Sequence, residues 1–162
     1  MSIGETALKF FEACETGQGW EECKAYCHDN ASFSCQAAPL SDVSTVADYA
    51  AWMKGIFGPL PDATYELKSF AIDDERQSVS AFAIFKASHT GEGGPVPPTG
   101  KSVASDYVYV MNFDNGKLQH MTKIWNSNYA LEALGWSQLL VEPGSNTQHC
   151  VIAVRTRLRS LS

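Results

Sequence analysis

The chain has 162 residues, of which 44% are apolar and 19% are charged. This composition indicates one globular domain and excludes a disordered chain. No apolar run approaches the ~18 residues of a membrane-spanning helix. The N-terminus also lacks the features of a signal peptide, so we expect a cytoplasmic protein.

Charge is distributed unevenly along the chain. Residues 1–142 contain all 18 acids and nine bases, for a net charge of −9, whereas residues 143–162 contain three bases and no acid. An acidic body argues against nucleic acid or an anionic membrane as the main partner.

Five cysteines, an odd number, follow an N-terminus without a secretory signal. Reduced thiols are therefore expected. Cys23 and Cys27 lie one helical turn apart beside His28, but no further ligands follow at a sharp spacing. Buried cysteine is usually a small hydrophobic residue, so we expect neither a metal site nor a cofactor.

Residues 6–15 have the spacing of an amphipathic helix. Leu8, Phe11 and Glu15 share one side, and further apolar residues flank them. Gly17 follows and is expected to end the helix.

Two more helices and a short strand are predicted before residue 60. A short helix covers about residues 20–26, a strand covers 31–35, and a longer helix covers about 45–57. Gly58 and Pro59 stop that last helix.

From residue 63 onward the apolar period changes from near 3.6 to 2, which indicates strands. The segment 79–89 is apolar on both sides and is therefore expected to be a central strand. A Gly/Pro-rich loop covers 90–99. Helices followed by a run of strands predict an α+β fold with a curved antiparallel sheet around the N-terminal helices. The expected strands are residues 63–72, 79–89, 103–113 and 117–125, followed by a short helix at 128–134.

The hairpin built from 103–113 and 117–125 determines which side chains share a face. A three-residue turn at 114–116 would place Tyr109 opposite Met121 and Tyr107 opposite Lys123, whereas a two-residue turn would shift one strand. The three-residue turn gives one face with Tyr107, Tyr109, Met111, Met121, Lys123 and Trp125. The other face then carries Asp106, Val108, Val110, Leu118, His120, Thr122, Ile124 and Asn126.

The first of these faces is aromatic and rich in methionine, with two phenols and one amine. It suits a ligand cavity, which is mostly apolar with a few polar groups. It equally suits an ordinary core whose tyrosine hydroxyls reach backbone or water. Trp52, Met53, Ile56 and Phe57, on the helix at 45–57, are expected to form a wall or lid over it.

Several stretches resemble one known family. SHTGEGGPVPPTGK (88–101), DYVYVMNFDNGKL (106–118), and KIWN (123–126) followed by LEALGW (131–136) are similar to the SnoaL-like polyketide cyclases of the nuclear-transport-factor-2-like superfamily. YCHDNASFSC (26–35) resembles the corresponding strand of ketosteroid isomerase. The likeness extends over about residues 5–136. It implies a cone-shaped, cystatin-like pocket inside a curved sheet, an apolar small-molecule ligand and a homodimer.

The resemblance also identifies the positions that perform chemistry in these families. The cyclases use a His on the penultimate strand and an Asp on the last strand, and here those positions hold Tyr109 and Lys123. Ketosteroid isomerase uses a Tyr on the first helix, an Asp on the penultimate strand and an Asp base after the first strand. Here Phe10, Tyr109 and Cys35 occupy them, so neither acid/base set is intact.

A different pair remains as the catalytic hypothesis. Lys123 in an apolar pocket would have a lowered pKa and could act as a base or as an amine toward a carbonyl, with Tyr109 as a hydrogen-bond donor. Alternatively, Lys123 extends to the rim and Tyr109 only shapes the wall. His89 is the third catalytic candidate, or else an anchor for the Gly/Pro loop. The ligand-binding candidates are Phe10, Cys35, Trp52, Phe57, Tyr107, Met111, Met121 and Trp125.

Three functions follow from these alternatives. The chain could be an isomerase, cyclase or lyase acting on an apolar carbonyl compound, a non-catalytic binding module, or a dimeric interaction protein. We expect the domain to cover residues 1–136. The tail at 137–162 could be an edge strand, a dimer arm or a flexible end.

Overall fold

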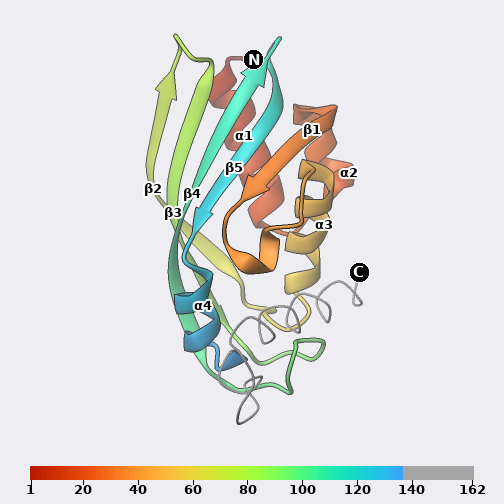
Figure 1. The fold of residues 1–162 in the computed structure, drawn as a ribbon, viewed down its shortest axis with the longest axis vertical. Helices are drawn as coiled ribbons and strands as arrows, with labels where there is room; N and C mark the ends of the chain where they lie inside the picture. The colour runs from red at the N-terminus through yellow and green to blue at the C-terminus, as the bar shows by residue number, and fades with distance from the viewer. Residues whose placement is uncertain (137–162) are drawn as a thin grey trace.

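The structure is a computed structural model that describes residues 1–136, so the expectations for the tail at 137–162 lie outside the described residues. Helices precede most of the strands, as the α+β prediction requires (Figure 1). The helices are α1 (Ile3–Glu15), α2 (Trp20–Cys23), α3 (Val46–Ile56) and α4 (Ser127–Ala133), and the strands are β1 (Cys27–Cys35), β2 (Thr64–Asp73), β3 (Ser78–Ser88), β4 (Ser102–Asp114) and β5 (Lys117–Trp125).

Side-chain caps fix where the two long helices begin. The Ser2 hydroxyl accepts from the Glu5 amide, and the Glu5 carboxylate accepts from the Ser2 amide, which satisfies two donors at the start of α1. The Thr45 hydroxyl accepts from the Asp48 amide at the start of α3.

The five strands form one curved sheet in the order β1-β5-β4-β3-β2. Strands β2 to β5 pair antiparallel, as predicted, and β3 is central between β2 and β4. The expectation of a purely antiparallel sheet was wrong at one edge, because β1 pairs with β5 in parallel. This parallel pair makes the sheet mixed. Strands β1 and β2 lie at opposite edges, so the strands within residues 1–136 do not close into a barrel.

The turn between β4 and β5 has two residues rather than three. Asp114 pairs with Lys117, and Asn115 and Gly116 have φ values of 48° and 77°, which is the conformation of a tight hairpin turn. A register shift follows immediately, because Phe113 pairs with Leu118 but Asn112 pairs with His120.

This bulge corrects two expectations. Tyr109 lies opposite Lys123, not Met121, and Tyr107 lies opposite Trp125. Leu118 is fully buried and does not share the outer face with half-buried His120. The shorter turn and the bulge each displace the predicted pairing by one residue, so the total displacement is two. The predicted face is therefore retained, with Tyr107, Tyr109, Met111, Met121, Lys123 and Trp125.

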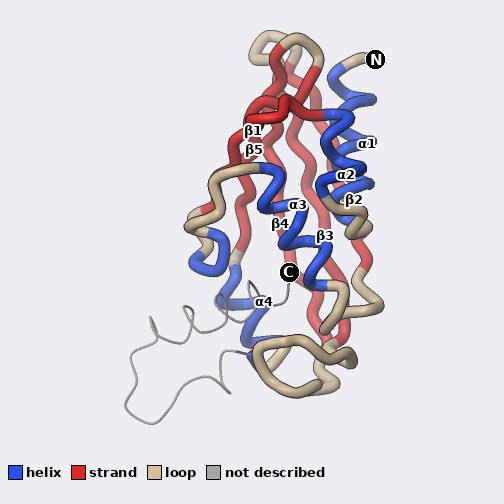
Figure 2. The backbone as a smooth tube through the Cα atoms, turned by 90° about the vertical axis from the view of Figure 1, so that its right-hand side faces the viewer, coloured by secondary structure: helices blue, strands red, loops and turns tan. Residues whose placement is uncertain are grey.

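Helices α1, α2 and α3 all lie against one face of the sheet (Figure 2). Phe10 and Phe11 of α1, Tyr49 of α3 and Tyr109 of β4 are fully buried between the two layers. None of the helices within residues 1–136 is long and apolar enough to cross a membrane.

Candidate functional site

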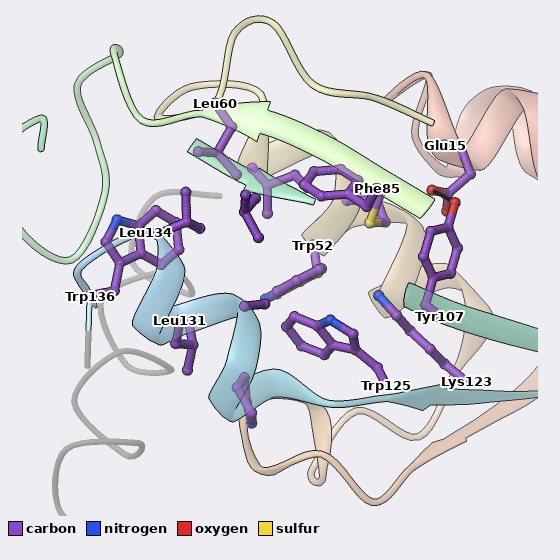
Figure 3. Close-up of a pocket in the computed structure, with 15 residues that line it drawn as sticks. Glu15, Trp52, Leu60, Phe85, Tyr107, Lys123, Trp125, Leu131, Leu134 and Trp136 are labelled. Carbon is purple, nitrogen blue, oxygen red and sulfur yellow. Dashed lines mark hydrogen bonds between the residues drawn. The ribbon is translucent and has the colours of Figure 1, made fainter. Parts of the chain in front are cut away.

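A small cavity lies between α3, α4 and the inner face of the sheet (Figure 3). Its enclosed volume is about 50 Å³, below the ~300–1,000 Å³ of typical small-molecule sites. A larger ligand therefore requires lining side chains to move. The residues that carry polar groups into the wall include Glu15, Tyr107 and Lys123, and the apolar lining includes Met53, Ile56, Leu60, Val103, Leu131 and Leu134.

Glu15, the last residue of α1, is a carboxylate inside the protein. Its side chain is only 2% exposed. It accepts a 2.6 Å hydrogen bond from the Tyr107 hydroxyl and a second hydrogen bond from the Tyr109 hydroxyl. Phe11, one turn earlier on the same helix side, is in the core, so the helix itself directs Glu15 inward.

Two tyrosines connect Glu15 to Lys123. The hydroxyls of Tyr109 and Tyr49 are hydrogen-bonded to each other, and the Lys123 Nζ donates to the Tyr49 hydroxyl at 3.1 Å. Because Tyr109 gives its single proton to Glu15, it must accept from Tyr49, which in turn accepts from Lys123. The hydrogen bonds therefore all run in one direction, from the amine to the carboxylate.

The amine of Lys123 is surrounded by four aromatic rings. Its Nζ lies 4.5 Å from the Trp125 ring centroid, 5.2 Å from that of Tyr49, 5.3 Å from that of Tyr107 and 5.6 Å from that of Trp52. These distances fall within the range of cation–π attraction, which stabilises a positive charge. Lys123 is 7% exposed, so it lies inside the pocket and does not extend to the rim.

Burial opposes ionisation at both ends of this chain. It lowers the pKa of Lys123, and the negative charge of Glu15 counteracts that effect. It raises the pKa of Glu15, against the charge of Lys123 and the hydrogen bonds from Tyr107 and Tyr109. Burial also raises the pKa of Tyr49 and Tyr109, the two tyrosines between Glu15 and Lys123, so both hydroxyls remain protonated donors. Burial therefore shifts the pKa values of Lys123 and Glu15 toward each other.

Cys35 pairs directly with Lys123 across β1 and β5. Burial raises the pKa of its thiol, which works against a thiolate base at neutral pH. Cys35 and Lys123 also line a more open groove of about 430 Å³, at the point where β1 leaves the sheet.

The remaining ligand-binding candidates divide into two groups. Trp52, Tyr107 and Trp125 line the cavity. The others belong to the closed packing: Phe10, Met111 and Met121 are essentially unexposed in the core, and Phe57 is half-buried with its ring against Gly17.

His89 is fully buried behind the cavity wall rather than in it. Its Nδ1 accepts from the Trp136 indole at 2.9 Å, and its backbone pairs with Lys101 and Gly100 across the base of the Gly/Pro loop. An indole only donates, so the ring proton is on Nε2, which faces Gly94 and has no partner among the described residues. These contacts fit the loop-anchor alternative.

The sequence-based candidate set omitted Glu15 and Tyr49. The first helix did contain a signal for Glu15, because the carboxylate follows buried Phe11 by one turn. The expectation that Leu8 lies on the same buried side was wrong, since Leu8 is 45% exposed. Tyr49 gave no comparable signal, since aromatic residues on a buried helix face are ordinary core residues. Within residues 1–136, no group of three His, Cys, Asp or Glu side chains is arranged to hold a metal ion.

Comparison with solved structures identifies the same fold in other proteins. AclR from Streptomyces galilaeus is 22% identical, with a TM-score of 0.67 over 82% of this chain and 95% of its own. IdmH from Streptomyces antibioticus is 18% identical, with a TM-score of 0.66 over 83% and 99%. TerC, crystallised with polyporic acid, is 13% identical, with a TM-score of 0.61 over 83% and 99%.

Sequence comparison gives the family. No curated protein matches this chain. The family of SnoaL-like polyketide cyclases matches residues 5–134, which is most of the chain and nearly all of the described fold. That match agrees with the resemblance noted in the hairpin and loop segments, and it is consistent with a ligand-binding protein of the cyclase or isomerase type. The chain belongs to the SnoaL-like polyketide cyclase family.

Proposed function

We propose that this protein binds an apolar carbonyl compound in the cavity and isomerises or cyclises it by acid–base chemistry, with Glu15 as the base. The observation that carries the proposal is the buried chain of hydrogen bonds that joins Glu15 and Lys123, both of which line the cavity. A carboxylate from α1 thus compensates for the carboxylates missing from β1, β4 and β5.

The chemistry requires proton removal beside a carbonyl and charge stabilisation at its oxygen. Glu15 takes the proton from the α-carbon, and Lys123 gives a proton to the carbonyl oxygen, which yields the enol. The two tyrosine hydroxyls then turn so that each donates toward the amine, and the proton held by Glu15 returns to Lys123 through Tyr109 and Tyr49. Each tyrosine gives one proton and receives one, so the site ends in its starting state.

The distribution of polar groups around the cavity supports a single ligand orientation. Glu15, Tyr107 and Lys123 lie together (Figure 3). Leu131 of α4 and Leu134, the residue that directly follows α4, form an apolar part of the wall. The carbonyl end of the ligand lies at Lys123, and its hydrocarbon body extends toward α4.

Hydrogen–deuterium exchange at carbon tests the proposal. The probe is 3-phenylpropanal in D₂O, and incorporation of deuterium at its α-carbon is followed by mass spectrometry. We expect catalysed exchange with the wild type and loss of at least about 10²-fold in rate for Glu15→Gln. Glu12→Gln, an exposed carboxylate on the same helix, is the matched control. Exchange by Glu15→Gln at the wild-type rate would contradict the proposal, and binding without exchange would favour a non-catalytic binding module.

The outer face of the sheet supports a second part of the proposal, a homodimer. Phe82, Val108 and Val110 are half-buried there, and Ile124 is 60% exposed. A contiguous apolar face of this kind fits an interface between copies. Sedimentation equilibrium of the wild type and of Val108→Lys tests it: we expect a dimer that the charge dissociates, and a monomeric wild type contradicts it.

A further inference from the structure

Lys123 differs from every other lysine in the chain. All eight lysines lie within the described residues, and the other seven are exposed. Lys123 alone is buried, at the wall of the cavity and inside four aromatic rings. A buried amine beside a hydrophobic cavity is the usual setting of a lysine that reacts with carbonyl groups.

We propose that Lys123 binds an aldehyde or ketone ligand covalently, as a protonated Schiff base. This inference rests on the proposed function, since it concerns the same site and the same class of ligand. In the covalent complex the iminium nitrogen takes the place of the protonated carbonyl oxygen as the group that draws electrons from the α-carbon.

The reaction begins from the neutral amine. The hydrogen bonds through Tyr49 and Tyr109 offer a path by which Lys123 passes one proton to Glu15. Burial lowers the pKa of Lys123 and raises that of Glu15, and both effects favour this transfer. The nitrogen lone pair is then free.

The bond changes balance without any outside oxidant or reductant. The nitrogen lone pair attacks the carbonyl carbon, the C=O π electrons move to oxygen, and a proton moves from nitrogen to that oxygen to give a carbinolamine. The C–O bond then breaks, and the oxygen leaves as water with a proton supplied by Glu15. The nitrogen lone pair forms the C=N bond, so amine, carbonyl compound and one proton give an iminium ion and one water.

The four aromatic rings around the Lys123 nitrogen stabilise the iminium ion better than the neutral amine. An iminium ion carries a positive charge on the same nitrogen, which lies 4.5 Å from the Trp125 centroid and 5.6 Å from the Trp52 centroid. Aromatic faces stabilise such a cation more strongly when it is shielded from water. The apolar lining also limits the water that would hydrolyse the C=N bond.

Reductive trapping tests the inference. The wild type is incubated at neutral pH with an equimolar amount of 3-phenylpropanal and sodium cyanoborohydride, and adducts are located by intact mass and peptide mapping. We expect one adduct per chain on Lys123, with a mass gain equal to the aldehyde less one oxygen. Exposed lysines react slowly under these conditions because a solvated ammonium group has no free lone pair.

Two variants complete the design. Lys123→Met should lose the fast adduct, and Lys117→Met, at the exposed start of the same strand, should still be trapped on Lys123. If the folded wild type is labelled on exposed lysines while Lys123 stays unmodified, the inference is overturned. This outcome is measured on the wild type, so it does not depend on whether Lys123→Met folds. Deuterium exchange at the α-carbon without an adduct on Lys123 refutes the Schiff base and leaves the proposed function standing. An adduct on Lys123 without exchange supports the Schiff base and contradicts the proposed acid–base function.

Discussion

Glu15 and Lys123 form the two ends of one chain of three hydrogen bonds, whose inner members are Tyr109 and Tyr49. The two residues lie far apart in the sequence, one at the end of α1 and the other in β5. Since all three bonds point the same way, a shift of three protons converts the charged pair into a neutral one. This property is the basis of the acid–base chemistry proposed for the site.

Tyr49→Phe should break this chain while keeping the ring. The ring stacks on Phe33 at 4.5 Å between centroids, and the variant retains that packing. We expect deuterium exchange to slow by at least about 10²-fold and the free energy of unfolding to fall by about 1–3 kcal/mol, because Lys123 and Tyr109 each lose a partner. Urea denaturation and the exchange assay measure the two effects.

Tyr129→Phe is the control for that variant, since Tyr129 is 55% exposed on α4. It should leave both quantities unchanged. Wild-type exchange by Tyr49→Phe would mean that Glu15 and Lys123 act without the tyrosines between them.

Glu15→Gln should change how stability depends on pH. The pKa of Glu15 is raised by burial above its ordinary value of 4.5, so its contribution to stability is complete below that pH and is lost as the pH rises through the folded-state pKa. Glutamine does not ionise. We therefore expect the wild type to lose stability relative to Glu15→Gln between acidic and neutral pH, by about 1.4 kcal/mol for each unit of pKa difference.

Lys123 reinforces this result. Its pKa is lowered by burial, so stability is lost as the pH falls through the folded-state pKa, and removing the Glu15 charge lowers that pKa further. Both effects favour the variant at the higher pH. Urea titrations at pH 4 and pH 7 provide the measurement, with Glu12→Gln as reference, and a pH-independent difference would contradict the assignment.

Trp125→Ala should enlarge the cavity. Trp125 and Trp52 both line it, are both only half-buried, and face each other edge to face at 6.2 Å between ring centroids. We expect tighter binding of a bulky fluorescent naphthalene probe and a loss of about 1–4 kcal/mol in unfolding free energy. Trp20→Ala, half-buried on α2, should cost stability without improving binding, and equal binding by both variants would show that Trp125 does not limit the cavity.

Two glycines near the end of α3 should respond in opposite directions to alanine. A Cβ on Gly91 would lie 2.0 Å from the Gly58 carbonyl oxygen, which requires the Gly/Pro loop to move. A Cβ on Gly55, inside α3, meets nothing within 4 Å. We expect Gly91→Ala to destabilise by about 1–3 kcal/mol and Gly55→Ala to stabilise by about 0.5–1 kcal/mol. Thermal unfolding of both variants checks this, and an unchanged melting temperature for Gly91→Ala would refute the close approach.

The helices, the central position of β3 and the inner face of the hairpin could be predicted from apolar spacing, because burial imposes the period directly. The direction of β1 could not, since its partner β5 lies far away in the chain. The bulge beside Phe113 also could not be predicted from the sequence. Asn115-Gly116 suits a two-residue turn, and the extra residue that this leaves in β5 is recognisable only once both strands are placed.

The candidate site was partly predictable for a similar reason. Strand alternation predicted that Lys123, Tyr107 and Trp125 share one face of the sheet, and all three line the cavity. The partner of Lys123 did not follow, because the link to Glu15 depends on how α1 crosses the sheet. Strand alternation also does not separate residues that line the cavity, such as Trp125, from residues packed beyond it, such as Met121.

The parallel pairing of β1 with β5 has a consequence for biosynthesis. Within residues 1–136, β1 is an edge strand that pairs with β5, the last of the described strands to leave the ribosome. Early in translation its hydrogen-bonding groups on that side have no strand to meet, and Glu15 has no Lys123. Contacts so distant in sequence slow folding and expose unpaired edges meanwhile. Until β5 emerges, one edge of β1 is therefore unpaired, and a polypeptide released before that point has the carboxylate of the hydrogen-bond chain without its amine.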